Sequence, residues 1–242
     1  MEDVHTRSSL HAQLERALLE QIGRGTWRSG DRLPTESELE ATYRVSRNTV
    51  RTALAALERR GLLERHAGRG TFLRHALYTH LMGWHEEPGN EFADQGLTPA
   101  VNVLAFGAVV GDSSDATRLG VPLGAPLLAV RRQFSVGGET TGMAEHRLPA
   151  ELASALTKRD YEALYPERSY RAAGVGVDRG TLLLTARAAT AEEASMLGVA
   201  AGTPLFAYER TLTLADGRRF EWAQAILRAD RARFRADFTV PR

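Results

Sequence analysis

Two consecutive helix starts, at Thr35 and Ser46, constrain the fold of this chain more than any other feature. Thr35 and Glu38 have the spacing of a capping box, in which the hydroxyl and the carboxylate each accept from the other residue's amide. Ser46 can cap the next helix, and Val45 and Val50 have the spacing of a hydrophobic staple around that cap. Two short helices joined by a tight turn are typical of a helix-turn-helix.

The flanking segments complete a small domain around this motif. Between Leu10 and Ile22 an apolar residue recurs at every fourth position, which predicts an amphipathic helix. After the motif, residues 62–65 and 71–74 are expected to form two strands joined by a glycine-containing turn at 67–70. A hairpin after the second helix of the motif is a wing, so we expect a winged helix-turn-helix over residues 1–74.

Positive charge is concentrated in this part of the chain. The whole chain has a formal net charge of only +1, whereas residues 46–74 contain seven arginines and two glutamates, a local net charge of +5. Helix-turn-helix proteins contact base edges with the first residues of the second helix, where Arg suits guanine and Asn suits adenine. The sequence therefore predicts base contacts from Arg47, Asn48 and Arg51, and a minor-groove contact from Arg69 at the tip of the wing.

The segment after the wing is expected to be a linker. Residues 75–90 lack a clean period and end in Pro-Gly-Asn, so we place a second domain over residues 91–242. The linker contains three histidines and two glutamates, which are His75, His80, His85, Glu86 and Glu87. Their spacing matches no helix-borne metal motif, so we expect no metal site.

Composition narrows the cellular context. The chain has no cysteine, which excludes disulfides and thiolate chemistry and fits a reducing cytoplasm. No apolar run approaches the ~20 residues that a membrane-spanning helix needs. The polar N-terminus does not have the pattern of a signal peptide. We therefore expect a cytoplasmic protein with no membrane segment.

The second domain contains an internal repeat. The pattern from Ala116 to Arg132, with a Leu-Gly-Val turn followed by Gly-x-Pro-Leu, recurs from Ala194 to Arg210. Each copy is expected to place a helix before two strands, and further strands are expected at 101–110 and 181–188, with short helices over 149–164. Two similar halves form one α/β domain, and a cleft between them is a favoured place for a small ligand. The whole chain is therefore expected to be α+β.

The N-terminal motifs resemble the GntR family of bacterial regulators. Residues 30–36 (GDRLPTE), 45–54 (VSRNTVRTAL), 61–63 (GLL) and 68–72 (GRGTF) follow the family pattern in order and spacing. The resemblance extends the expected DNA-binding set to Arg32, Thr35, Ser37, Ser46, Thr49, Gly68 and Thr71. Many members carry Arg where this chain has Ser37, so any contact from that Arg is absent or weaker here.

The second domain resembles the UTRA effector domain of the HutC-type branch of that family. The resemblance is based on the doubled LGxxxGxPL turn, the LPAEL segment and the FE pair near the end. It implies a fold similar to chorismate lyase and a small anionic effector, such as a phosphate, phosphonate, carboxylate or sugar phosphate. The matching candidates for effector contacts are Arg132, Glu145, Glu221, Arg228 and Asp230. Phe134 stands where relatives often have a second Arg, which predicts weaker binding or a smaller ligand.

These observations predict a ligand-responsive repressor that binds an inverted-repeat operator on double-stranded DNA as a homodimer, without a cofactor. Alternatives stay open for single residues: Arg132 and the equivalent Arg210 could form structural salt bridges, and Arg228 could pair with Asp230. A constitutive DNA-binding or partition protein is the second hypothesis. A lyase-like enzyme fused to a DNA-binding module is a third, but no nucleotide-binding or hydrolase motif is present, and the sole lysine, Lys158, has no cofactor motif around it.

Overall fold

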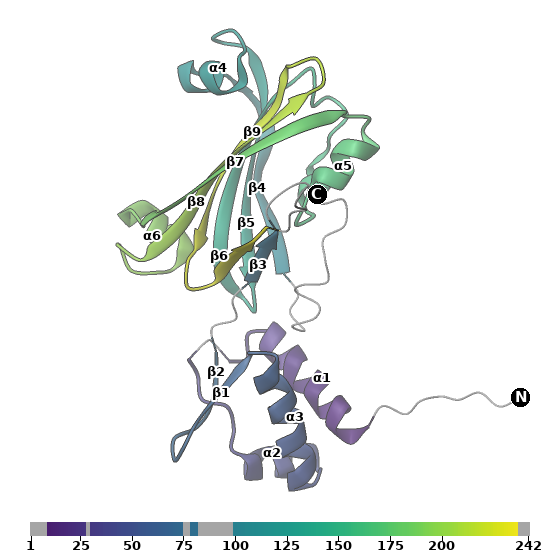
Figure 1. Cartoon of the computed structure of the whole chain (residues 1–242), viewed down its shortest axis with the longest axis vertical. Coiled ribbons are helices and arrows are strands. Elements are labelled where there is room, and N and C mark those ends of the chain that lie inside the picture. Colours follow the sequence, from purple (N-terminus) through teal and green to yellow (C-terminus); the bar gives the residue numbers. More distant parts are fainter. Residues whose placement is uncertain (1–8, 28–29, 75–77, 82–98, 237–242) are drawn as a thin grey trace, which may run out of the picture. The chain divides into compact units, whose positions relative to one another are not determined.

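The structure is a computed structural model that describes residues 9–27, 30–74, 78–81 and 99–236. These residues form two compact units, one around three helices and a hairpin, the other around a six-stranded sheet (Figure 1). The expected α+β architecture, with a winged helix-turn-helix before an α/β domain, is confirmed.

The first unit packs three helices against a hairpin. Its elements are α1 (Leu10–Gly23), α2 (Glu36–Tyr43), α3 (Arg47–Arg59), β1 (Leu63–His66) and β2 (Gly70–Leu73). The strands pair antiparallel, as a wing requires. Each of the five elements contributes apolar side chains to the core. These are Leu14, Leu18, Ile22, Leu39, Val50, Ala53, Leu54, Leu57, Leu63 and Leu73.

Both predicted caps begin their helices. The Thr35 hydroxyl accepts from the Glu38 amide at 3.3 Å, and the Glu38 carboxylate accepts from the Thr35 amide at 2.7 Å. The Ser46 hydroxyl accepts from the Thr49 amide at 3.3 Å. Arg44 ends α2 in the left-handed conformation, with a φ of 53°, which turns the chain at once towards α3.

The second unit is built on one six-stranded sheet. Its strands are β4 (Pro99–Val110), β5 (Pro126–Val136), β6 (Glu139–Pro149), β7 (Val177–Ala188), β8 (Pro204–Leu214) and β9 (Arg219–Arg228), in the spatial order β4-β5-β6-β9-β8-β7. A separate parallel pair joins β3 (Tyr78–Leu81) to β10 (Ala232–Arg235). The expected linker at 75–90 thus contains a strand that pairs with the end of the chain, while the domain limits themselves stay predictions.

The two halves of this sheet follow the internal repeat. Each runs strand, helix, strand, strand, with α4 (Ser113–Leu119) in the first half and α6 (Ala191–Leu197) in the second. Asp112 and Thr190 begin these helices in capping boxes, and Gly120 and Gly198 end them with φ values of 70° and 65°. The halves meet where β6 pairs antiparallel with β9. Residues from the two repeats therefore lie side by side along this seam.

The two faces of the sheet are covered differently. On one, the covered face, β-strand side chains pack with Tyr161 of η1 (Lys158–Tyr161) and Tyr170 of α5 (Glu167–Ala172). On the other, the open face, α4 packs on Leu127 and Trp222, and α6 packs on Met143 and Leu205. Of the short helices expected over 149–164, the described residues contain η1. The expectation missed α5, which is too short to show a helical period.

Candidate DNA interface and effector site

Helix α3 exposes the residues that the sequence predicts to meet DNA. Arg47, Asn48 and Arg51 are exposed in its first two turns, and Thr49 is half-buried. The opposite side of the helix is fully buried through Val50. The exposed end is also the helix N-terminus, whose amides favour a phosphate. The geometry of α3 therefore suits insertion into a major groove.

Glu36 tethers the first arginine of α3. The Glu36 carboxylate accepts from the Arg47 Nε at 3.2 Å, and it lies 3.9 Å from the Arg65 guanidinium. No described residue forms a hydrogen bond with the terminal nitrogens of Arg47, whose side chain is 73% exposed. A guanidinium held at Nε presents its two terminal nitrogens outward, the geometry that bidentate binding to guanine requires.

Three of the predicted contact residues also hold the local fold. Thr35 and Ser46 are the caps of α2 and α3, and the Thr49 hydroxyl hydrogen-bonds to the Ser46 hydroxyl at 2.9 Å. Ser37 is exposed in the first turn of α2. The capping hydroxyls are thus committed to the helices, so a loss of DNA binding after their removal would not by itself prove a contact.

The wing is fixed to the segment before α2. The Leu33 amide donates to the Thr71 carbonyl at 2.8 Å, and Thr71 is half-buried. Gly70 has a φ of 114°, and a Cβ there would lie 2.6 Å from the Arg32 Nε, so the guanidinium of Arg32 packs across glycine backbone. Gly68 and Arg69 are exposed at the tip. This arrangement presents Arg69 to solvent on a braced hairpin.

Arg132 lies on the covered face and is almost fully buried. Its side chain is 3% exposed. Its Nε donates to the His146 Nε2 at 3.1 Å, and one terminal nitrogen donates to the Ala163 carbonyl at 2.8 Å. The guanidinium also lies 5.0 Å from the Phe134 ring centre and 5.8 Å from that of Tyr161. No carboxylate of the described residues forms a salt bridge with it, so the hydrogen-bond partners of this cation among these residues are all neutral.

His146 connects Arg132 to a buried carboxylate. Because the Arg132 Nε donates to Nε2, the proton of the neutral ring lies on Nδ1, which donates to Glu221 at 2.7 Å. Burial, with the charge of Arg132 adding to it, lowers the pKa of His146 to about 4. His146 is therefore neutral near pH 7. It fixes Arg132 and Glu221 relative to one another without adding a charge.

Glu221 is the centre of the buried network. It is 0% exposed and accepts from Tyr170 at 2.6 Å and from Arg210 at 2.7 Å, in addition to His146. Burial alone would raise the pKa of Glu221, but the charge of Arg210 and the hydrogen bonds from His146 and Tyr170 outweigh it and hold the pKa well below its usual range. Arg210 also donates to Glu167 of α5. Sequence analysis missed His146, Tyr170 and Glu167, although the repeat does make Arg210 equivalent to Arg132.

The structure divides the five residues expected to contact the effector. Arg132 and Glu221 share the covered face and are joined through His146. Glu145 is on the open face, because side chains alternate along a strand, and it accepts from Arg131 at 3.0 Å and from Gln224 at 3.1 Å. Arg228 pairs with Asp230 at 2.8 Å, which was the open alternative for these two. These three residues are therefore not brought together with Arg132.

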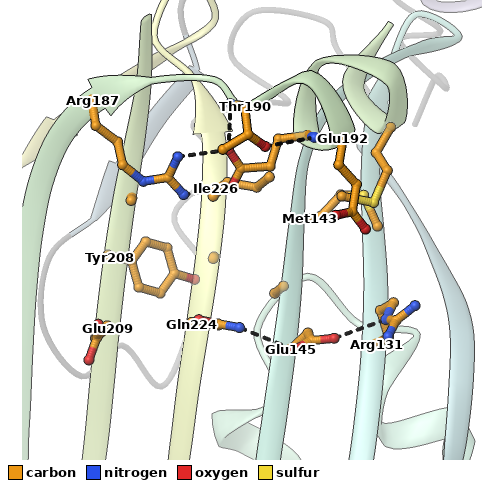
Figure 2. A pocket seen from close by; sticks show the side chains of 15 residues that line it. Arg131, Met143, Glu145, Arg187, Thr190, Glu192, Tyr208, Glu209, Gln224 and Ile226 are labelled. Atoms are coloured by element: carbon orange, nitrogen blue, oxygen red, sulfur yellow. Dashed lines mark hydrogen bonds and ion pairs between the residues drawn. The ribbon is translucent and has the colours of Figure 1, made fainter. Parts of the chain in front are cut away.

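Glu145 lines a cleft on the open face instead (Figure 2). The cleft has a volume of about 490 Å³ and lies between α6 and strands of both repeats. Figure 2 shows Glu209, Gln224, Glu145 and Arg131 in one row across the strands. Ala207, Ile226 and Met143, in register across β8, β9 and β6, form an apolar row between these polar groups and α6. This cleft and the buried network lie on opposite faces of the same β6–β9 seam.

A winged helix-turn-helix joined to a sheet domain with a buried polar site defines a class of protein, the ligand-responsive DNA-binding regulator. Two family models match the chain: "Bacterial regulatory proteins, gntR family" over residues 10–73 and "UTRA domain" over residues 94–233. The chain belongs to the GntR family and is a transcription regulator with a UTRA domain, as the motifs predict.

Curated relatives and a solved structure agree with this assignment. The HTH-type transcriptional repressor PhnF of Mycolicibacterium smegmatis is 32% identical over 94% of this chain and 92% of its own length. The HTH-type transcriptional repressor NagR of Bacillus subtilis is 28% identical over 93% of each chain. The crystal structure of PhnF from Mycobacterium smegmatis has a TM-score of 0.68 at 29% identity and covers 96% of this chain and 100% of that one. The likeness therefore extends over both units.

Among the described residues, no helix is both long and apolar enough to cross a membrane. In the same part of the chain, no three His, Asp or Glu side chains are grouped as a metal site would need. Of the residues in the expected linker, His75, His85, Glu86 and Glu87 lie outside the described part of the chain. His80 belongs to β3, but its side chain lies outside the description.

Proposed function

We propose that this regulator is a repressor that binds an inverted-repeat operator as a homodimer and responds to a small anionic effector bound at Arg132. The observation that carries the effector proposal is a buried guanidinium with neutral partners only. A buried charge is costly unless an opposite charge or strong hydrogen bonds compensate it. A bound phosphate, phosphonate or carboxylate would supply that charge, and a guanidinium can bind such groups through two hydrogen bonds.

One donor of Arg132 is available for this role. Its Nε donates to His146 and its Nη1 to backbone carbonyls, of which Ala163 is the nearest, whereas Nη2 has no partner among the described residues. Phe134, 5.0 Å from the guanidinium, stands where a second cation would lie, so the site favours a small anion. In this proposal Glu221 acts as a positioning residue, since it orients His146, which in turn orients Arg132.

An anion panel tests the effector proposal. Phosphate, methylphosphonate, acetate and glucose 6-phosphate are titrated into the full chain, and melting temperature and calorimetric heat are recorded. One anion should bind, and Arg132→Ala should weaken it about 10- to 100-fold, because a charge-assisted hydrogen bond is usually worth about 1.5 to 3 kcal/mol. Arg131→Ala is the matched control: it removes the adjacent arginine, whose side chain lies on the open face. Equal losses in both variants would refute a specific role for Arg132.

Selection from a random duplex library tests the operator proposal. A homodimer has two-fold symmetry, so the selected sites should be inverted repeats, with half-sites about 10 base pairs apart or at a multiple of that spacing. Sedimentation of the free chain should show a dimer. If the chain is monomeric and selects a single half-site, the dimer proposal is wrong. If no anion changes operator affinity, a constitutive DNA-binding protein explains the data better than a ligand-responsive repressor.

A further inference from the structure

The cleft on the open face has a charge pattern that the effector proposal does not use. Both arginines of its lining, Arg131 and Arg187, are neutralised by carboxylates on its own walls. Arg131 pairs with Glu145 at 3.0 Å, and Arg187 pairs with Glu193 through both oxygens, at 2.7 and 2.5 Å. The Arg187 partner holds the pKa of Glu193 at about 2, so this pair stays ionised at any physiological pH.

Two further carboxylates of the cleft have no counter-charge. Glu209 on β8 and Glu192 on α6 both line it, both are exposed, and no described residue forms a hydrogen bond or ion pair with either. With the two arginine pairs neutral, the lining therefore carries a net charge of −2. Glu209 stands directly opposite Gln224, which stands opposite Glu145, so the free carboxylate extends a polar row across the seam (Figure 2).

An apolar strip lies beside that row. Ala207, Ile226 and Met143 are in register across β8, β9 and β6, one step nearer to α6, and Met196 of α6 faces the same cleft. Methionine side chains are flexible and polarisable, so they adapt to varied apolar groups. The cleft thus combines an apolar strip with unpaired negative charge. Its volume of about 490 Å³ is within the range of small-molecule sites.

We propose that this cleft binds a small amphipathic organic cation, such as an alkylamine or diamine. The ammonium group would lie against Glu209 or Glu192, and the alkyl chain would lie along Ala207, Ile226 and the methionines. This site would be distinct from the anion site at Arg132, because the sheet separates them. Since β6 and β9 contribute side chains to both, a cation in the cleft would contact the same strands that carry His146 and Glu221.

Calorimetric titration of the full chain with 1,5-diaminopentane at fixed salt tests the proposal. The diamine should show one saturable site, and 1,5-pentanediol, its neutral counterpart, should show none. Glu209→Gln and Glu192→Gln each remove one charge with little change of shape, and each should weaken binding about three- to tenfold. Glu151→Gln is the matched control, since it makes the same charge change at an exposed residue outside the cleft. Arg131→Gln should have the opposite effect and tighten binding, because it releases Glu145.

The same titration separates this proposal from the anion site. Arg132→Ala should leave diamine affinity unchanged even where it abolishes anion binding. Absence of a saturable site for the diamine overturns the proposal, as does equal affinity in Glu209→Gln, Glu192→Gln and the unaltered chain. Sedimentation of the same variants provides a second check: if they change the oligomeric state and not the diamine affinity, the cleft is a subunit contact and the proposal is wrong.

Discussion

The two repeats of the second domain place an arginine at the same point of the same strand, Arg132 on β5 and Arg210 on β8. Both side chains lie on the covered face and both are linked to Glu221. Arg210 contacts it directly and also pairs with Glu167, so two carboxylates surround it. Arg132 reaches Glu221 only through a neutral histidine. One repeat position therefore carries a charge-paired arginine in one half and a charge-unpaired arginine in the other.

This difference suits the two arginines of the repeat to different roles: Arg210 to holding the fold and Arg132 to binding a ligand. A buried cation whose charge is already balanced by carboxylates has no electrostatic need for an anionic ligand, and removing one partner leaves a buried charge. A buried cation among neutral groups keeps its attraction for an anion. The repeat therefore explains why both positions are arginine, and the partners explain which of them is suited to an effector.

The largest expected effect is on stability. Arg210→Met leaves two buried carboxylates without their cation, so the free energy of unfolding should fall by about 3 to 5 kcal/mol. Arg132→Met removes a cation that has no carboxylate partner, and the loss should be about 1 to 3 kcal/mol, chiefly for the unsatisfied His146. Urea unfolding at pH 7 measures both. Equal losses in the two variants would break the comparison, since Arg132 would then be as structural as Arg210.

The histidine between the two arginines predicts a pH dependence. Its folded pKa of about 4 is below the ordinary value of 6.5, chiefly because of burial. Below pH 6.5 the His146 side chain takes up a proton in the unfolded chain but not in the folded one. Its contribution to the free energy of unfolding is therefore fully present above pH 6.5. It is lost as the pH decreases towards 4, by about 3 kcal/mol in all.

Urea unfolding between pH 4.8 and 7.5 measures this slope. His146→Gln should flatten it, because the amide can accept from Arg132 and donate to Glu221 but does not titrate in this range. Restricting the window to pH above 4.8 limits the contribution of carboxylate protonation, which affects both proteins alike. An unchanged slope in His146→Gln would mean that other groups cause the acid sensitivity and that His146 is not the neutral link.

The parts of the molecule that the sequence predicts well are those determined by near neighbours. The caps at Thr35 and Ser46 depend on residues three positions away, and both are present with the expected partners. The repeat is likewise visible because identical turns recur at a constant offset. Local hydrogen bonding and turn chemistry leave few alternatives at these places.

The proposed effector site depends on contacts that no local pattern indicates. His146 and Glu221 are 75 positions apart, and α5, which supplies Tyr170 and Glu167, has only six residues. Glu145 illustrates a second difficulty: one step along a strand reverses the face, so Glu145 belongs to the open cleft and its neighbour His146 to the buried network. The family motifs place candidate residues on β5, β6 and β9, but the face on which each side chain lies depends on the sheet register.

The contrast between paired and unpaired arginines extends to the DNA-binding domain, with a smaller expected effect. Arg47 is tethered to Glu36 at 3.2 Å, whereas Arg51 has no partner among the described residues. Arg47→Ala should cost about 1 to 3 kcal/mol of operator affinity and relax the preference at one base pair. Glu36→Gln should relax the same base preference by a smaller amount, because Arg47 keeps its charge but loses its tether. Anisotropy titrations with the operator and single-base variants measure this, and full discrimination in Glu36→Gln would show that the tether has no role.

The smallest expected effect concerns Arg69 at the tip of the wing. Its side chain is exposed, and its guanidinium carbon lies 5.9 Å from the Phe72 ring centre without a carboxylate to fix its direction. An untethered cation suits the phosphate backbone or a narrow minor groove better than a single base edge. Arg69→Ala should therefore weaken binding to operator and to unrelated duplexes by the same factor, and it should reduce the slope of log affinity against log salt by about one.

Arg69→Lys keeps the charge and should preserve that slope, which separates charge from shape. Titrations at four salt concentrations on both duplexes supply the slopes. If Arg69→Ala instead alters base preference at constant slope, an unpaired arginine also reads sequence, and the distinction drawn between tethered and free arginines fails in this domain.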